Sequence, residues 1–86
     1  MSEPSKPLLW VASSKKDLMT LPSEVQDVFG YALHLAQQGR KHEQAKPLKG
    51  FGGAGVLEVV EDFKSDTYRA VYTVKFGHTV YVLHCF

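Results

Sequence analysis

The sequence has little of several features that define common classes of protein. Cysteine occurs once in 86 residues, at Cys85, which rules out an intramolecular disulfide and a zinc site built on several cysteines. No apolar run approaches the roughly 20 residues that a transmembrane helix needs, and the N-terminus lacks the flanks of a signal peptide. The formal net charge is only +1, so bulk charge makes no case for nucleic-acid binding. We therefore expect a soluble, cytoplasmic protein that makes no contact with a membrane.

Motifs for metal or nucleotide chemistry are also missing. The four histidines show no spacing typical of a metal site, and no HExxH motif accompanies them. The glycine-rich stretch KPLKGFGGAG lacks the Gly-Lys-Ser/Thr ending of a phosphate loop, and the pattern after it is that of a strand rather than a helix. We expect no metal and no cofactor.

β-Branched and aromatic residues crowd three consecutive runs in the C-terminal half. Each run predicts a strand, and short polar turns between them predict an antiparallel meander; the runs are Val56–Phe63, Thr67–Phe76 and Thr79–Phe86.

The N-terminal half predicts a strand and two helices. After a flexible tail over residues 1–6, the apolar run Leu8–Ala12 suits a strand and Lys15–Met19 a short helix. Apolar residues at three- and four-residue spacing predict a longer helix over Pro22–Gln38. Together these elements predict one α+β domain over residues 1–86, with two N-terminal helices on one face of a mostly antiparallel four-stranded sheet in the order β-α-α-β-β-β.

Arg69 is the residue of the predicted meander that most needs an explanation. Side chains alternate faces along a strand, so Tyr68 and Tyr72 share an apolar face while Arg69 and Lys75 share the other. A guanidinium on a sheet face suits a phosphate, with which it forms two parallel hydrogen bonds. Alternatively, Arg69 pairs with Glu58, which has the appropriate parity on the neighbouring strand.

Basic residues also gather between Arg40 and Lys49. The run is either a solvated helix end and loop or a basic lip over a binding cleft, in which Lys49 and Lys75 converge with Arg69. A nucleophilic role for Cys85 is disfavoured because the adjacent His84 points to the opposite side of the strand.

The order of elements and the YRAVY pattern in the second meander strand resemble the RelE/HigB superfamily of bacterial toxins from toxin–antitoxin modules, and most closely its phage-derived branch. The blocks that carry the resemblance are KPLKGFGGAGVLEVVED, DTYRAVYTVKF and VYVLHCF. The resemblance implies a metal-independent endoribonuclease, an mRNA interferase that cleaves messenger RNA, usually on the ribosome. The ribose 2′-OH attacks the adjacent phosphate in this reaction, and a separately encoded antitoxin silences the enzyme.

The resemblance also implies roles for individual residues. Arg69 would stabilise the phosphate and Lys49 would help electrostatically, while His84 and Tyr72 are candidates for proton transfer, although parity predicts that Tyr72 faces away from Arg69. With Lys46 of the basic run and Lys75 of the sheet face added, the predicted RNA-binding set comprises Lys46, Lys49, Arg69 and Lys75.

The sequence departs from the phage-derived branch after its last block. Relatives continue from the His-x-Phe pattern into a lysine-rich segment and a helix, whereas this sequence stops at Phe86. The alternative hypothesis is therefore a catalytically inactive module of the toxin fold that binds an antitoxin or self-associates through an exposed C-terminal strand. Gyrase-poisoning toxins of the same fold are a further alternative, although the basic cleft favours RNA.

Overall fold

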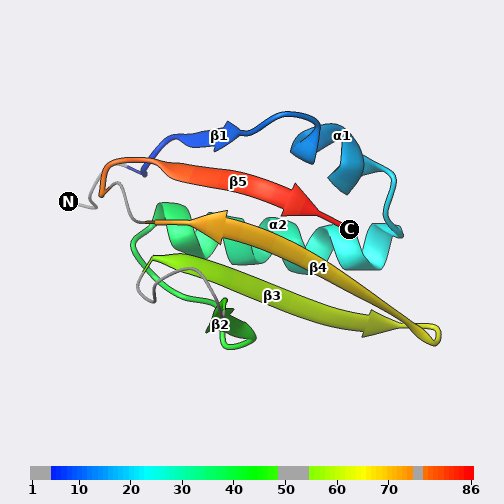
Figure 1. Cartoon of the computed structure of the whole chain (residues 1–86). Coiled ribbons are helices and arrows are strands. Elements are labelled where there is room, and N and C mark those ends of the chain that lie inside the picture. Colours follow the sequence, from blue (N-terminus) through cyan, green and yellow to red (C-terminus); the bar gives the residue numbers. More distant parts are fainter. Residues whose placement is uncertain (1–4, 49–54, 75–76) are drawn as a thin grey trace.

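The computed structural model describes residues 5–48, 55–74 and 77–86, which form one sheet and two helices (Figure 1). The elements follow one another as β1 (Leu8–Trp10), α1 (Ser14–Met19), α2 (Ser23–Gln37), β2 (Ala45–Pro47), β3 (Val56–Phe63), β4 (Asp66–Thr73) and β5 (Val80–Cys85). The predicted α+β class is confirmed, and the first meander strand has the predicted bounds. The predicted Lys75–Phe76 end of the second strand lies outside the described residues.

The sheet has five strands rather than four, in the order β1-β5-β4-β3-β2. Neighbouring strands are antiparallel except for β1 and β5, which are parallel. The prediction missed β2, a strand of three residues that contains a proline. Its place at the sheet edge explains why Pro47 is tolerated there, because an edge strand can spare a backbone donor.

Both helices pack on one side of the sheet, which we call the inner face; Figure 1 shows α2 behind the strands. The apolar stripe that predicted α2 is the stripe that packs against this face. Together with Leu18 of α1, the core contains Val25, Phe29, Ala32, Leu33 and Ala36 from α2 and Ala45, Val59, Ala70, Tyr72, Val80, Val82 and Cys85 from the strands. The opposite side of the sheet, the outer face, is therefore free of α1 and α2. Among the described residues, no helix is long and apolar enough to cross a membrane.

A β-bulge in β5 controls which side chains reach each face. Val71 of β4 pairs with His84, whereas the next residue, Tyr72, pairs with Val82, so Leu83 is the extra residue. As a result Val82 and Cys85 are both buried on the inner face although they are three residues apart. His84 emerges on the outer face.

The predicted N-terminal tail is shorter than expected. The backbone N–H of Lys6 donates to the carbonyl of Gln37 at 2.8 Å, and the side-chain amide of Gln37 donates back to the carbonyl of Lys6 at 2.9 Å. Lys6 is thus fixed to the end of α2, while residues 1–4 lie outside the described part of the chain.

Candidate functional site

Two rows of side chains cross the outer face at its centre. Strand register sets the first row, in which Lys46 of β2 lies beside Glu58 of β3, followed by Val71 of β4 and His84 of β5. The second row runs from Val60 to Arg69 and then to Phe86. The two rows therefore bring together residues of four strands. Lys46 and His84, the ends of the first row, are 38 positions apart in the sequence (84 minus 46).

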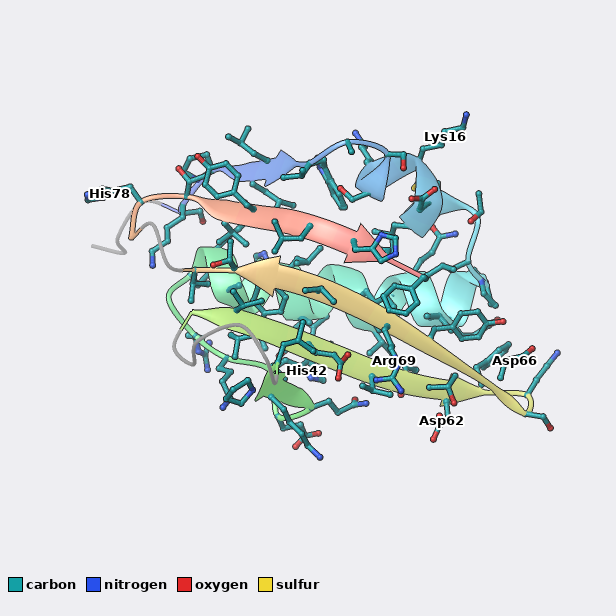
Figure 2. The ribbon with its side chains drawn as sticks, viewed as in Figure 1. Lys16, His42, Asp62, Asp66, Arg69 and His78 are labelled. Carbon is teal, nitrogen blue, oxygen red and sulfur yellow. The ribbon has the colours of Figure 1, made fainter. Side chains whose placement is uncertain are left out.

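Arg69 is paired with a carboxylate on this face. Its Nη1 lies 3.1 Å from Oε2 of Glu58, and the exposed fractions of the two side chains are 40% for Arg69 and 19% for Glu58. Figure 2 shows Arg69 in front of the sheet, between β4 and β3. The sequence left open whether Arg69 serves a phosphate or pairs with Glu58. In the isolated chain the guanidinium pairs with Glu58. The pair is partly in solvent, so a ligand can approach it.

The backbone of Arg69 is held on its other side by Phe86. The N–H of Arg69 donates to the Phe86 carbonyl at 2.6 Å, and the N–H of Phe86 donates to the Arg69 carbonyl at 2.8 Å. This exchange of both hydrogen bonds defines a closely bonded antiparallel pair, whose side chains project from the same face. Arg69 therefore has Glu58 as its side-chain partner on the β3 side and Phe86 as its backbone partner on the β5 side.

His84 completes the group on the outer face. Its imidazole lies against the ring of Phe86, with ring centroids 4.5 Å apart and planes inclined at 33°. His84 is exposed while its neighbour Cys85 is buried, as strand alternation predicts. Burial raises the pKa of the Cys85 thiol to about 11, and the negative charge of Asp17 adds to this shift. Cys85 therefore stays protonated at neutral pH and away from the site.

Tyr72 does not join the site. It is fully buried on the inner face, where its hydroxyl has no hydrogen-bond partner among the described residues, and burial raises the pKa of this phenol above its ordinary value. The parity argument from the sequence placed Tyr72 on the face away from Arg69, and the strand register agrees. A proton-transfer role beside Arg69 is incompatible with this position.

The predicted lysines are only partly described. Lys46 is exposed on β2 beside Glu58, and it lines a pocket of about 280 Å³ together with Glu43, Gln44 and Val60. Lys49 and Lys75 lie outside the described residues. Within the described ranges, histidine, cysteine and acidic side chains form no group of three that could hold a metal ion.

Glu58 is the residue of this site to which the sequence reading gave no chemical role. It entered that reading only as a structural partner for Arg69, yet its carboxylate lies at the centre of the outer face. The sequence did contain a signal for this position. Alternation along the two strands places Glu58 and Arg69 on the same face, where they are diagonal neighbours.

A comparison with protein families shows to which family the chain belongs. The family model described as phage derived protein Gp49-like matches residues 16–86, which is most of the chain. The chain belongs to the Gp49-like family. The match includes β3, β4 and β5, so this Gp49-like chain carries its entire Arg69 site inside the family's region. No curated protein matches the sequence.

A solved structure shares the fold of this Gp49-like chain. A chain of the toxin–antitoxin complex RelBE2 from Mycobacterium tuberculosis aligns with a TM-score of 0.62 and 20% sequence identity. The alignment covers 94% of this chain and 95% of the other. The resemblance deduced from the sequence is thus confirmed at the level of family and fold.

Proposed function

We propose that this Gp49-like protein is the toxin of a toxin–antitoxin module and a metal-independent endoribonuclease that cleaves messenger RNA. The observation that carries the proposal is the grouping of a guanidinium, a carboxylate and an imidazole on an accessible sheet face. These are the three kinds of group that cleavage by a ribose 2′-OH requires: a phosphate stabiliser, a base and an acid.

Arg69 is the phosphate ligand in this mechanism. A pentacoordinate phosphorane gains negative charge as it forms, and a guanidinium stabilises it through charged hydrogen bonds. In the free protein Arg69 is engaged by Glu58, so the RNA phosphate takes over part of that interaction when it binds. The exchange replaces one anion by another and leaves no buried charge unpaired, because both side chains reach solvent.

Glu58 and His84 move the protons. Both are paired with Val71, one from each side, which separates their Cα atoms by two strand spacings, or about 10 Å. Glu58 accepts the proton of the 2′-OH as its oxygen bonds to phosphorus, and a protonated His84 donates a proton to the departing 5′-oxygen. The products are a 2′,3′-cyclic phosphate and a free 5′-hydroxyl. An acid and a base on the two strands that flank β4, the strand that carries Arg69, suit the in-line path of this displacement.

Lysines extend the contact to the RNA backbone. Lys46 lies in the row of Glu58 and His84, and we assign the same role to Lys49 and Lys75, which lie outside the described residues. Phosphate contacts of this kind make binding salt-dependent, with an expected slope of about −0.7 in log affinity against log salt for each contact to a single strand. Lys46→Ala is expected to remove one phosphate contact and so to make that slope less steep by about 0.7.

Two partners follow from the proposal. The RelBE2 chain of the same fold was solved in a toxin–antitoxin complex, which supports a cognate antitoxin as protein partner here. The ribosome is the second, because cleavage of translated messenger RNA is what the RelE/HigB resemblance implies. We place both the free protein and its substrate in the cytoplasm.

The test is inducible expression of the protein in bacteria, with growth arrest and messenger RNA cleavage on translating ribosomes as readouts. Arg69→Ala is expected to lower cleavage by about 10²- to 10³-fold and to abolish arrest. Glu58→Gln and His84→Gln are expected to lower cleavage by about 10²- to 10⁴-fold. The chain's other arginine, Arg40, is exposed beyond α2, so Arg40→Ala is the matched control and should retain full activity. Folded wild-type protein that neither arrests growth nor cleaves RNA would refute the proposal.

A second candidate function is a non-catalytic module that binds an antitoxin or self-associates. The observation that favours it is the ion pair itself, since Glu58 already occupies the guanidinium. In that case Arg69→Ala should change neither growth nor RNA levels, and partner binding through apolar surface should persist at high salt, where an RNA complex dissociates.

A further inference from the structure

Phe86 places an unusual surface next to the Arg69 site. Its side chain is 51% exposed, although a phenylalanine gains free energy from burial, and the two residues beside it on this face are Arg69 and His84. Its ring already packs against His84, so two aromatic rings lie side by side at the solvent surface. An aromatic surface beside a guanidinium is a pattern typical of binding sites for single-stranded nucleic acid.

The backbone fixes the position of this ring relative to the phosphate ligand. Arg69 and Phe86 exchange both backbone hydrogen bonds, which places their Cα atoms about 5.5 Å apart with side chains on one face. Arg69 turns toward Glu58 on the β3 side, and Phe86 is the residue paired with Arg69 on the β5 side. A nucleotide whose phosphate lies on Arg69 therefore has its neighbouring base within reach of Phe86.

We propose that Phe86, supported by the ring of His84, is the stacking platform for the base on the 3′ side of the scissile phosphate. The inference rests on the proposed function, in which His84 protonates the departing 5′-oxygen. That oxygen belongs to the nucleotide 3′ of the cut, so this nucleotide lies over β5, where Phe86 and His84 are neighbours. Phe86 is a substrate-positioning residue, and it also holds the imidazole in place by contact.

The platform has a consequence for specificity. Stacking on a ring accepts all four bases, because every base has a flat face, and its strength varies with the size of the base. We therefore expect a graded preference for purines over pyrimidines 3′ of the cut, without an absolute requirement. Hydrogen-bond readout would instead produce a sharp choice of one base.

Binding of a short RNA tests the platform separately from catalysis. The probe is an eight-nucleotide RNA with a 2′-deoxy residue at the cleavage position, which cannot react, and fluorescence anisotropy measures its affinity at low salt. Phe86→Leu, which keeps an apolar side chain but loses the ring, is expected to weaken binding by about 10- to 100-fold, and Phe86→Trp is expected to restore it. Leu9→Ala is the matched control, an exposed apolar residue at the far edge of the same face, and should leave affinity unchanged.

The position of the stacked base is tested with abasic probes. An abasic site 3′ of the cleavage position should weaken binding to the wild type as much as Phe86→Leu does, and should add nothing in that variant. Loss of affinity only with an abasic site on the 5′ side would overturn the assignment, as would equal affinities of the wild type and Phe86→Leu. If the wild type and Phe86→Leu bound equally well while cleavage still depended on Arg69, the platform would be refuted and the proposed function would stand. If the wild type bound this RNA but failed to cleave translated messenger RNA, the proposed function would fail instead.

Discussion

The two faces of the sheet are built from the same strands but carry opposite kinds of side chain. On the inner face Val59, Ala70 and Tyr72 pack against α2 and are almost fully shielded from water. On the outer face their immediate neighbours along the chain include Glu58 and Arg69, which remain in contact with solvent. Stability therefore depends mainly on the inner face, whereas the proposed chemistry belongs to the outer face, so substitutions can separate the two.

The largest expected effect is the loss of a core ring from the inner face. Phe29→Ala removes a fully buried side chain of α2 and should lower the free energy of unfolding by about 3–5 kcal/mol, measured by urea denaturation. Tyr31→Ala, on the exposed side of the same helix, removes only an edge-to-face contact with His42 and should lower it by no more than about 1.5 kcal/mol. Similar losses from the two variants would mean that α2 is not packed on the sheet as described.

Next in size is the contrast between two adjacent residues of β5. Because the pKa of Cys85 is raised to about 11 from 9.0, its thiolate fraction at pH 8 is about 100-fold lower than in the unfolded chain. Alkylation by iodoacetamide should be slower by at least that factor in the folded protein. Diethyl pyrocarbonate should modify the neighbouring His84 readily. Rapid alkylation of the folded protein would show that Cys85 is exposed, which would mean that the side chains of β5 point to the opposite faces from those described.

The same shift predicts how stability depends on pH. Between pH 9.0 and 11 the unfolded thiol has lost its proton while the folded one retains it, so the free energy of unfolding falls as pH rises through this range. Below pH 9.0 both states are protonated and Cys85 contributes no pH dependence. Urea denaturation of the wild type and of Cys85→Ala at pH 8 and pH 10.5 should show the difference, with a shallower decline in the variant.

A smaller effect of opposite sign is expected from Tyr72→Phe. The hydroxyl of Tyr72 is buried without a partner among the described residues, so its removal should raise the free energy of unfolding by about 1 kcal/mol. Cleavage activity should be unchanged, because the residue faces away from Arg69. A large loss of cleavage in a stable Tyr72→Phe variant would contradict the division of labour between the two faces.

The smallest expected effect is the contribution of the outer-face ion pair to stability. A double-mutant cycle of Arg69→Ala and Glu58→Ala should give a coupling of about 0.2–1 kcal/mol that decreases with salt, because the guanidinium is 40% exposed. Activity should fall by orders of magnitude in the same variants. A coupling of several kcal/mol would identify the pair as a structural element instead.

The sequence predicted the main elements well because their patterns are strong. The apolar spacing from Val25 to Ala36 marks α2, and the polar turn at Lys64 and Ser65 bounds β3 and β4. In contrast, β2 has three residues with no periodicity to detect, and its pairing with β3 exists only in the folded chain. The class of the fold could thus be predicted, but the fifth strand could not.

The candidate site was predicted in part. Parity along β4 identified Arg69 and excluded Tyr72 from its face, since alternation is a local property. The neighbourhood of Arg69 was harder to predict because it depends on how β5 is placed against β4. The bulge at Leu83 changes that register, so the proximity of Phe86 to Arg69 could not be obtained by counting from the turn.

The position of β5 between β1 and β4 has a consequence for how the protein is made. β1 is synthesised first but pairs with β5, so 72 positions separate Leu8 from its partner Val80 (80 minus 8). Because such a distant pairing cannot form before its second strand has left the ribosome, β1 waits unpaired while the intervening residues are translated. The same late strand supplies His84 and Phe86. The sheet and the outer-face group around Arg69 are therefore completed together, because both depend on the pairing of β5.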